Sequence, residues 1–204
     1  MIHRRDLLIF TAAATAWPCL AAERVVITIL GDSITAGLGL PASQALPVQL
    51  QAELARRGLR VTVRGAGVSG DTSGGGLARA DFSVQADTGL CVVALGGNDL
   101  LQGVDPKVTQ ANLEKIIQKL ERRRIAVVLA GISPPPAIGR SYAQAFAGLY
   151  RQLAKRHHLA LYPDLLAGVS QSQRQRDGLH PNALGARTIA VGLAPVILRA
   201  LAKR

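Results

Sequence analysis

The fold of this chain is decided by one stretch, Val25-Val26-Ile27-Thr28-Ile29-Leu30-Gly31-Asp32-Ser33-Ile34-Thr35. Its first six residues are apolar or β-branched, which is typical of a strand buried on both faces of a parallel sheet. Gly31 and Asp32 break the run, so Ser33 falls in a strand-to-helix turn. A serine in such a turn lies at the rim of the sheet, where its hydroxyl can act as a nucleophile. The plainer interpretation is that Ser33 or Thr35 only caps the following helix.

Apolar runs alternate with helical patterns along the rest of the chain, which predicts a parallel sheet with helices on both faces. We expect strands at 25–30, 60–64, 90–95, 125–130 and 159–162. We expect helices at 45–57, 76–86, 106–123, 141–157 and 181–199. The carboxyl ends of parallel strands meet at one edge of a sheet. Because Ser33, Gly70 and Asn98 each closely follow a strand, we expect all three at that edge.

Length and composition indicate one domain with a large hydrophobic core. The chain has 204 residues, of which 49% are hydrophobic, and its formal net charge is +11. Most of the basic residues stand near the ends of predicted helices, where they complement the helix dipole and face water. Only 3% of the residues are aromatic, whereas proteins that bind single-stranded nucleic acid need aromatic stacking platforms. We therefore expect a monomer with a solvated basic surface, no nucleic-acid partner and at most weak contact with anionic lipid.

The first 22 residues read as an export signal. A charged start, His3-Arg4-Arg5, precedes an apolar stretch from Leu7 to Trp17 that is too short to span a bilayer. Ala21-Ala22 offers a cleavage site, and the pair of arginines is also typical of a twin-arginine signal. We expect an exported protein, periplasmic or secreted, with its functional domain at 23–204. The alternative is an N-terminal anchor that is not cleaved.

A carboxylate and an imidazole stand three residues apart near the C-terminus, in Asp177-Gly178-Leu179-His180-Pro181. This spacing can place Asp177 beside His180, so that His180 acts as the general base for Ser33. The alternative is a loop aspartate that caps the next helix. The histidines have no metal-ligand spacing of the His-Glu-x-x-His kind, so we expect no metal site. Cys91 lies in an apolar run, where a buried and inert thiol is the default.

An amide donor follows the predicted third strand, in Gly96-Gly97-Asn98-Asp99. The Asn98 side chain can donate to a developing oxyanion, and the glycines allow close backbone approach. The alternative is a turn asparagine that tolerates left-handed geometry. We expect Asp99 to hydrogen-bond neighbouring loop backbone rather than to react.

Gly65-Ala66-Gly67-Val68-Ser69-Gly70 matches the Gly-x-Gly-x-x-Gly pattern of dinucleotide-binding loops, and Asp87 follows it. This match offers a different function, that of a nucleotide-dependent oxidoreductase. The motif belongs to the second strand unit rather than the first. It is also followed by further glycines at the point where a packed helix would have to begin in order to bind a pyrophosphate. A loop whose Gly70 amide faces the Ser33 oxyanion fits better.

Taken in order, these blocks resemble the SGNH-type (GDSL-like) hydrolase family over about residues 24–200. The matching blocks are Gly31-Asp32-Ser33, Ser69-Gly70-Asp71-Thr72, Gly96-Gly97-Asn98-Asp99 and Asp177-Gly178-Leu179-His180-Pro181. The resemblance implies a three-layer α/β/α, flavodoxin-like fold with a five-stranded parallel sheet. It also implies Ser33, Asp177 and His180 as catalytic residues, an oxyanion hole from Ser33, Gly70 and Asn98, and no cofactor. Ile34-Thr35 replaces the commoner Leu-Ser, and Arg64 stands where many members have asparagine.

The activity that this resemblance implies is hydrolysis of carboxylic esters or thioesters, an EC 3.1 reaction, through an acyl-enzyme on Ser33. Expected substrates are small molecules: aryl esters, short to medium acyl chains, acyl-CoA or lysophospholipid. A carbohydrate O-deacetylase of the same fold is one alternative, and a non-catalytic basic binding module is another. We expect an open, shallow apolar groove. Its expected lining is Leu100-Leu101, Val104, Pro134-Pro135-Pro136, Ile138, Leu165-Leu166 and Val169.

Overall fold

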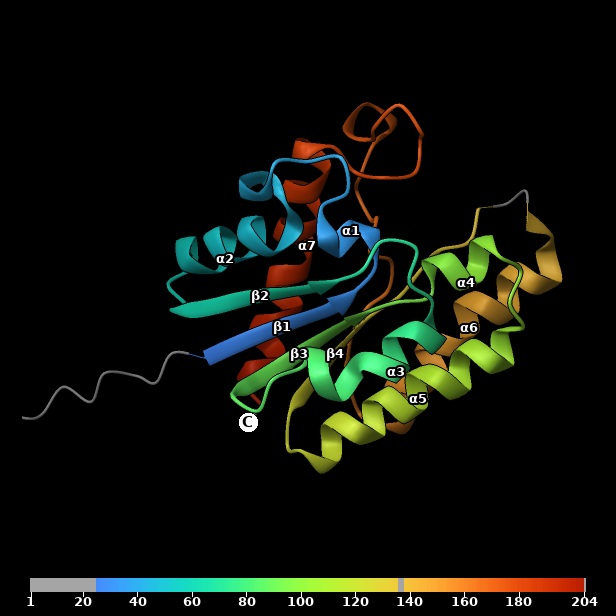
Figure 1. Cartoon of the computed structure of the whole chain (residues 1–204), viewed down its shortest axis with the longest axis horizontal. Coiled ribbons are helices and arrows are strands. Elements are labelled where there is room, and N and C mark those ends of the chain that lie inside the picture. The colour runs from blue at the N-terminus through green and yellow to red at the C-terminus, as the bar shows by residue number, and fades with distance from the viewer. Residues whose placement is uncertain (1–24, 136–137, 204) are drawn as a thin grey trace, which may run out of the picture.

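A computed structural model describes residues 25–135 and 138–203 (Figure 1), so the predicted export signal lies outside the described residues. The fold prediction is confirmed: five parallel strands form one sheet in the order β2-β1-β3-β4-β5. The strands are β1 Val25–Gly31, β2 Val61–Gly67, β3 Thr88–Ala94, β4 Ala126–Ala130 and β5 Ala160–Tyr162. The α-helices are α1 Ser33–Ala36, α2 Leu46–Arg56, α3 Ser73–Ser83, α4 Gly97–Leu101, α5 Pro106–Arg122, α6 Arg140–Arg156 and α7 Ala183–Leu201. Two short 3-10 turns cover Ala42–Gln44 and Gln171–Gln173.

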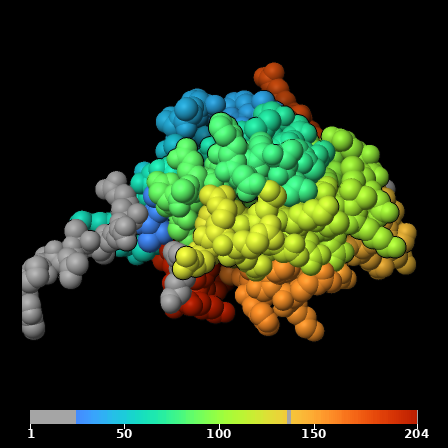
Figure 2. Space-filling view, turned by 60° about the horizontal axis from the view of Figure 1, so that its bottom comes forward, coloured from blue at the N-terminus to red at the C-terminus, as the bar shows by residue number. Residues whose placement is uncertain are grey.

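Helices cover both faces of the sheet and so divide the core into two parts. On one face α2 and α7 pack on the strands through leucines and isoleucines such as Leu50 and Leu193. On the other face α3, α5 and α6 contribute residues such as Leu113 and Phe146. Figure 2 shows α3 (green) and α5 (lime to yellow) as one continuous surface over this second face, with α6 (orange) beside them. The result is the expected three-layer arrangement.

The central strand, β3, is buried along most of its length, as its unbroken apolar sequence predicts. Cys91 on this strand is fully buried, and burial raises the pKa of its thiol to about 12. The thiol therefore stays protonated at neutral pH, and the prediction of an inert cysteine is confirmed. Helix α7 is long and apolar enough to cross a membrane by length and composition. Its apolar residues Ile189, Leu193 and Ile197 are fully buried in the core, which accounts for that composition.

The second strand differs from the sequence prediction in a way that matters for the site. β2 continues to Gly67 instead of ending at residue 64, and Gly65 and Gly67 pair with Ile29 and Gly31 of β1. A Cβ on Gly67 would lie 2.3 Å from the backbone N of Ala36, so glycine lets β2 pass directly against the α1 turn. The dinucleotide interpretation is therefore wrong, because the first two glycines of its motif belong to a strand rather than to a phosphate-binding loop.

The remaining differences are local. Helix α3 begins at Ser73 rather than at residue 76, because the Thr72 side chain accepts a hydrogen bond from the N–H of Gly75 and so caps the helix earlier. Helices α1 and α4 have four and five residues, too few to produce a periodic pattern in the sequence. Both lie directly after strands, at the carboxyl edge of the sheet.

Replacing Gly67 tests this close approach. Gly67→Ala should destabilise the protein by about 1–3 kcal/mol, because the new Cβ meets backbone atoms that cannot move aside independently. Gly148→Ala is the matched control: its Cβ would meet nothing closer than 3.8 Å in the middle of α6. The control should gain about 0.5–1 kcal/mol from helix propensity. Urea unfolding of both variants measures the difference, and equal stability of the two would contradict the packing described here.

Candidate active site

Three predicted residues from distant parts of the chain meet at the carboxyl edge of the sheet. The Ser33 Oγ lies 2.8 Å from Nε2 of His180, although 147 positions separate them in sequence. The Nδ1 of His180 lies 2.6 Å from Oδ2 of Asp177. This geometry fits an Nδ1–H that donates to Asp177 and an Nε2 that accepts the Ser33 hydroxyl proton. The arrangement is that of a nucleophile, a general base and a carboxylate that orients the base.

Asp177 is held in place by the backbone that follows it. Its Oδ1 accepts hydrogen bonds from the backbone N–H groups of Leu179, at 2.9 Å, and of His180, at 3.0 Å. The bond from the His180 ring, followed by these two backbone bonds, lowers the pKa of Asp177 to about 2. The carboxylate therefore stays ionised at neutral pH and can stabilise a positive charge on the imidazole.

The loop that carries His180 is tied to the segment after Ser33 by Gln175. The Gln175 Nε2 donates to the carbonyl oxygens of Leu38, at 2.7 Å, and Pro181, at 3.0 Å. The backbone N–H of Gln175 also donates to the carbonyl of His180, at 2.8 Å. Gln175 therefore holds the loop that carries His180 against the segment that follows Ser33. The sequence contains no pattern that would have identified it.

The predicted oxyanion donors also lie at this edge, because Ser33, Gly70 and Asn98 belong to the segments that follow β1, β2 and β3. Gly70 has φ +81°, a backbone conformation that favours glycine, and no other described residue accepts a hydrogen bond from its N–H. The N–H of Ser33 is at the first turn of α1, where a helix leaves its amides unpaired. The Asn98 Nδ2 donates one of its two hydrogens to the Asp71 carbonyl at 2.8 Å. This bond orients the amide and leaves its second hydrogen available to another acceptor.

A buried carboxylate joins the segments that carry Gly70 and Asn98. Asp99 is 1% exposed and accepts hydrogen bonds from the backbone N–H of Ser73 at 2.7 Å and the Ser73 hydroxyl at 2.5 Å. Its Oδ1 also accepts from Thr109 at 3.0 Å. Asp99 thus fixes α4 against the starts of α3 and α5. The expectation that it bonds backbone rather than reacts agrees with these contacts, and its two hydroxyl partners were not anticipated.

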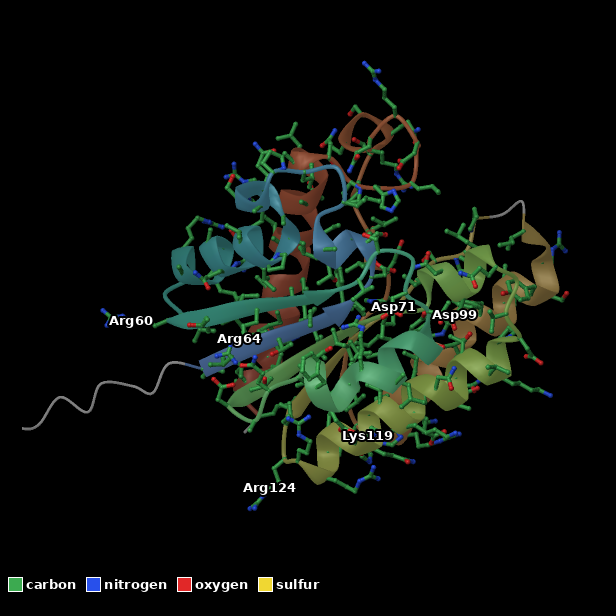
Figure 3. All side chains as sticks on the ribbon, viewed as in Figure 1. Arg60, Arg64, Asp71, Asp99, Lys119 and Arg124 are labelled. Carbon is green, nitrogen blue, oxygen red and sulfur yellow. The ribbon has the colours of Figure 1, made fainter. Side chains whose placement is uncertain are left out.

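One arginine connects the ends of β1 and β2 to the Gly70 loop. The Arg79 guanidinium donates to the carbonyls of Gly31 at 2.7 Å and Ala66 at 2.9 Å, and its Nε donates to Oδ2 of Asp71 at 2.7 Å. Figure 3 shows Asp71 and Asp99 close together at the carboxyl end of the sheet. Arg79 was not predicted, because an arginine inside a helix pattern looks like an ordinary surface residue.

Another buried carboxylate, that of Asp32, directly precedes Ser33 in the chain. Asp32 is 4% exposed, and its Oδ1 accepts the backbone N–H of Ile34 at 3.0 Å, which caps α1. Burial raises the pKa of Asp32 to about 6, although the Ile34 bond and the neighbouring His180 charge both oppose the rise. The carboxyl group therefore titrates close to the neutral range.

Of the residues expected to line an apolar groove, Leu101 is exposed, whereas three others are not. Leu100, Leu165 and Val169 are buried in the two cores, so the prediction that they line a groove is wrong. Five exposed apolar side chains of the described residues, Leu101 among them, lie within five positions in sequence of a candidate site residue. They are Leu38, Val68, Leu101, Leu179 and Leu184.

Two hollows of the surface lie away from the candidate site residues. One of about 260 Å³ lies beside Ile125 and His158, and one of about 490 Å³ lies beside Pro134 and Arg151, and no candidate site residue lines either. In residues 25–135 and 138–203, no group of three or more His, Cys, Asp and Glu is placed to hold a metal ion. Of the remaining histidines, His157 contacts Glu114 and Glu121.

Comparisons with known proteins agree with this geometry. Residues 29–188 match the model of the GDSL-like Lipase/Acylhydrolase family. Esterase TesA of Pseudomonas aeruginosa is 40% identical over 180 residues, which cover 87% of this chain and 90% of that protein. Thioesterase 1/protease 1/lysophospholipase L1 of Escherichia coli is 36% identical and covers 79% of this chain and 78% of its own. A crystal structure of TesA superimposes with a TM-score of 0.81 at 37% identity, covering 87% and 99% of the two chains.

Arg79→Lys should lower kcat by roughly 10–100-fold and leave KM within about twofold. Lysine keeps the charge but cannot span Gly31, Ala66 and Asp71 at once, so the strand ends can shift relative to one another. Arg64→Lys is the matched control, because Arg64 also grips a carboxylate with two nitrogens, that of Asp87, far from the site. Steady-state kinetics of both variants provide the test. A rise in KM alone, or equal losses in both, would contradict a positioning role for Arg79.

Asp32→Asn should change how stability depends on pH. Asp32 has an ordinary pKa near 3.8 in the unfolded chain and about 6 in the folded protein. Between these values the folded protein retains a proton that the unfolded chain has lost, so stability falls as pH rises from about 4 to about 6. Asparagine cannot ionise and still accepts the Ile34 N–H. The variant should therefore gain roughly 2–3 kcal/mol over the parent between pH 4 and pH 7.

Denaturant unfolding across this pH range measures that gain. Asp105→Asn corrects for the loss of one carboxylate, because Asp105 caps α5 in the same way but at an exposed position. A difference between Asp32→Asn and the parent that does not vary with pH would show that Asp32 is ionised in the folded protein well below pH 6.

Proposed function

The chain belongs to the GDSL-like lipase/acylhydrolase family and is an ester hydrolase, and we propose that Ser33 is its nucleophile. The observation that carries this proposal is the continuous set of bonds from Ser33 Oγ through His180 to Asp177. Both bonds have the lengths that proton transfer and tautomer control require. We further propose Gly70 and Asn98 as oxyanion donors together with the backbone N–H of Ser33.

The reaction then proceeds in two halves, acylation of Ser33 and hydrolysis of the acyl-enzyme. His180 Nε2 accepts the Ser33 proton as Oγ attacks the carbonyl carbon, and the new oxyanion is held by the three donors. Collapse of the tetrahedral intermediate breaks the bond to the alcohol or thiol, which leaves with the proton from His180. Water then gives a proton to His180 as its oxygen attacks the acyl carbon. Collapse of this second intermediate breaks the bond to Ser33 Oγ, which takes the proton back from His180 as the carboxylic acid leaves. Asp177 keeps the imidazole oriented throughout and stays ionised.

We propose aryl esters and short to medium acyl esters as substrates, with thioesters or lysophospholipids as further members of the class. Exposed apolar side chains lie close in sequence to Ser33 and the other candidate site residues, which favours broad acceptance of apolar acyl groups. The relative from Escherichia coli is named for thioesterase and lysophospholipase activities. Export of the protein, with residues 1–22 as the signal, remains part of the same proposal.

The alternatives differ in what they require near Ser33. A carbohydrate O-deacetylase needs polar side chains that bind sugar hydroxyls, whereas several exposed side chains close in sequence to the candidate site residues are apolar, among them Leu38, Val68 and Leu101. A binding module without catalysis needs no hydrogen-bonded serine, histidine and aspartate. The family membership also favours a hydrolase over both a binding module and an oxidoreductase.

Ser33→Ala should lower kcat for p-nitrophenyl butyrate by about 10⁴-fold or more, because the acyl-enzyme can no longer form. Ser133→Ala is the control, since Ser133 is exposed in the loop after β4 and bonds no candidate site residue. Circular dichroism and thermal melting should show that both variants fold. Turnover by folded Ser33→Ala at a rate near that of the parent would remove Ser33 from the mechanism.

A substrate series separates the two kinds of ester hydrolase. Across p-nitrophenyl esters from acetate to octanoate, kcat/KM should vary gradually, because one methylene in an open groove contributes only about 1–3 kcal/mol. Acetylated xylan and acetylated chitooligomers should be poor substrates by comparison. Rates on the acetylated sugars far above those on p-nitrophenyl butyrate and acyl-CoA would favour the deacetylase instead.

A further inference from the structure

The positive charge of the molecule gathers at one end. Six exposed basic side chains there have no acidic partner among the described residues. We call this surface the basic end; its six residues are Arg60, Arg122, Arg124, Lys155, Arg199 and Lys203. Arg60 directly precedes β2, and the others end α5, α6 and α7 or lead from them.

The topology explains why these residues meet. Helices that connect parallel strands run antiparallel to them, so the C-terminal ends of α2, α5 and α6 lie at the amino edge of the sheet, as does that of α7. Basic residues at helix C-termini complement the helix dipole, but the dipole does not require that basic residues outnumber acidic ones at this end. The acidic residues at this end already contact a neighbouring cation or histidine. They are Glu53, Asp81, Asp87, Glu114 and Glu121.

The opposite end, which carries the candidate active site, has no such surplus. Its basic residues are Arg79, Lys107, Arg140, Arg174, Arg176 and Arg187. Its acidic residues are equally many: Asp32, Asp71, Asp99, Asp105, Asp164 and Asp177. Figure 3 shows the separation, with Arg60 and Arg124 at the amino ends of the strands and Asp71 and Asp99 at the carboxyl ends. Apart from Lys115 and Arg151, which lie between the two ends on α5 and α6, the surplus of positive charge among the described residues is therefore on the side facing away from Ser33.

The N-terminal segment joins the domain at the basic end as well. Val25, the first residue of β1, lies at the amino edge of the sheet (Figure 1). The apolar stretch from Leu7 to Trp17 precedes it by only seven residues, which span at most about 25 Å even when fully extended. While the predicted signal is still attached and lies in a membrane, the basic end is therefore the part of the domain nearest to the lipid headgroups.

We propose that the basic end is a docking surface for an anionic phospholipid bilayer, and that it leaves the candidate active site facing the water. The complementary charge favours phosphate headgroups, and each exposed cation near such a surface adds to the attraction. Nucleic acid also carries phosphates, but the chain is only 3% aromatic and lacks stacking platforms. In this orientation, the bound enzyme can hydrolyse substrates that reach its active site from solution. The proposal does not depend on which residue is the nucleophile.

Two triple variants with the same net charge test the proposal. Arg122→Gln, Lys155→Gln and Arg199→Gln remove cations from the C-terminal ends of α5, α6 and α7. Lys107→Gln, Arg140→Gln and Arg187→Gln remove the same number from the N-terminal parts of the same three helices. All six side chains are exposed, so melting temperatures should confirm that both proteins fold. Both share the parent's N-terminus, so any contribution of residues 1–24 is equal.

Sedimentation with phosphatidylglycerol or phosphatidylcholine vesicles measures the binding. The parent should prefer phosphatidylglycerol, and added salt should weaken that binding. The variant at the basic end should bind about 100-fold more weakly, and the control within about threefold of the parent. Bound parent should hydrolyse p-nitrophenyl butyrate within twofold of its free rate.

Four results would overturn the proposal. The first is equal binding to both kinds of vesicle, and the second is an equal loss of binding in both triple variants. The third is loss of turnover by the bound enzyme, because that loss would show that the candidate active site faces the bilayer. The fourth is tighter binding to single- or double-stranded DNA than to phosphatidylglycerol, lost in the basic-end variant, which would assign the surface to nucleic acid.

Discussion

The candidate site depends on the three hydrogen-bonded groups that surround the Arg79 guanidinium. The end of β1, the end of β2 and the Gly70 loop each offer an acceptor, and a single planar cation binds all three. Ser33 follows the first of these acceptors by two positions, and Gly70 precedes the third by one. The distance between Ser33 and Gly70, the proposed nucleophile and oxyanion donor, is therefore set by a rigid guanidinium rather than by loops alone. Asp99 likewise fixes the segment that carries Asn98 against the start of α3, through its two hydrogen bonds from Ser73.

Much of the fold could be predicted because the strongest signals are local. The apolar run of β1 and the periodic face of α5 need no tertiary information to be recognised. The same is true of the aspartate and histidine at 177 and 180, whose spacing already places them within one loop. The extension of β2 through Gly65 and Gly67 could not be predicted, because glycines usually end a strand. Only the close approach of the α1 turn explains why the strand continues there.

The supporting residues of the site were hidden for a different reason. Arg79, Gln175 and Asp32 act through partners that are distant in sequence or through burial, and neither feature leaves a spacing pattern. The groove prediction failed in the same way, because Leu165 and Val169 look like loop residues but turn inward to the core. Residue type could nominate the groups that perform chemistry, whereas the groups that position them became visible only in three dimensions.

One topological fact links the site to the charge distribution. In a parallel sheet, helix N-termini face the carboxyl edge and helix C-termini face the amino edge. Backbone N–H donors are therefore available at the edge that holds Ser33, and basic side chains accumulate at the other end. The chain separates its chemistry from its charged surface without needing a second domain.

The central claim is that Ser33 Oγ is the reacting atom, and covalent labelling tests it most directly. A fluorophosphonate should modify the folded protein at one site, and peptide mapping by mass spectrometry should find the phosphonate on Ser33. Cys91, which is buried with a thiol pKa of about 12, should remain unmodified. A phosphonate on any other serine, or no adduct on protein that is actively turning over ester, would contradict the account.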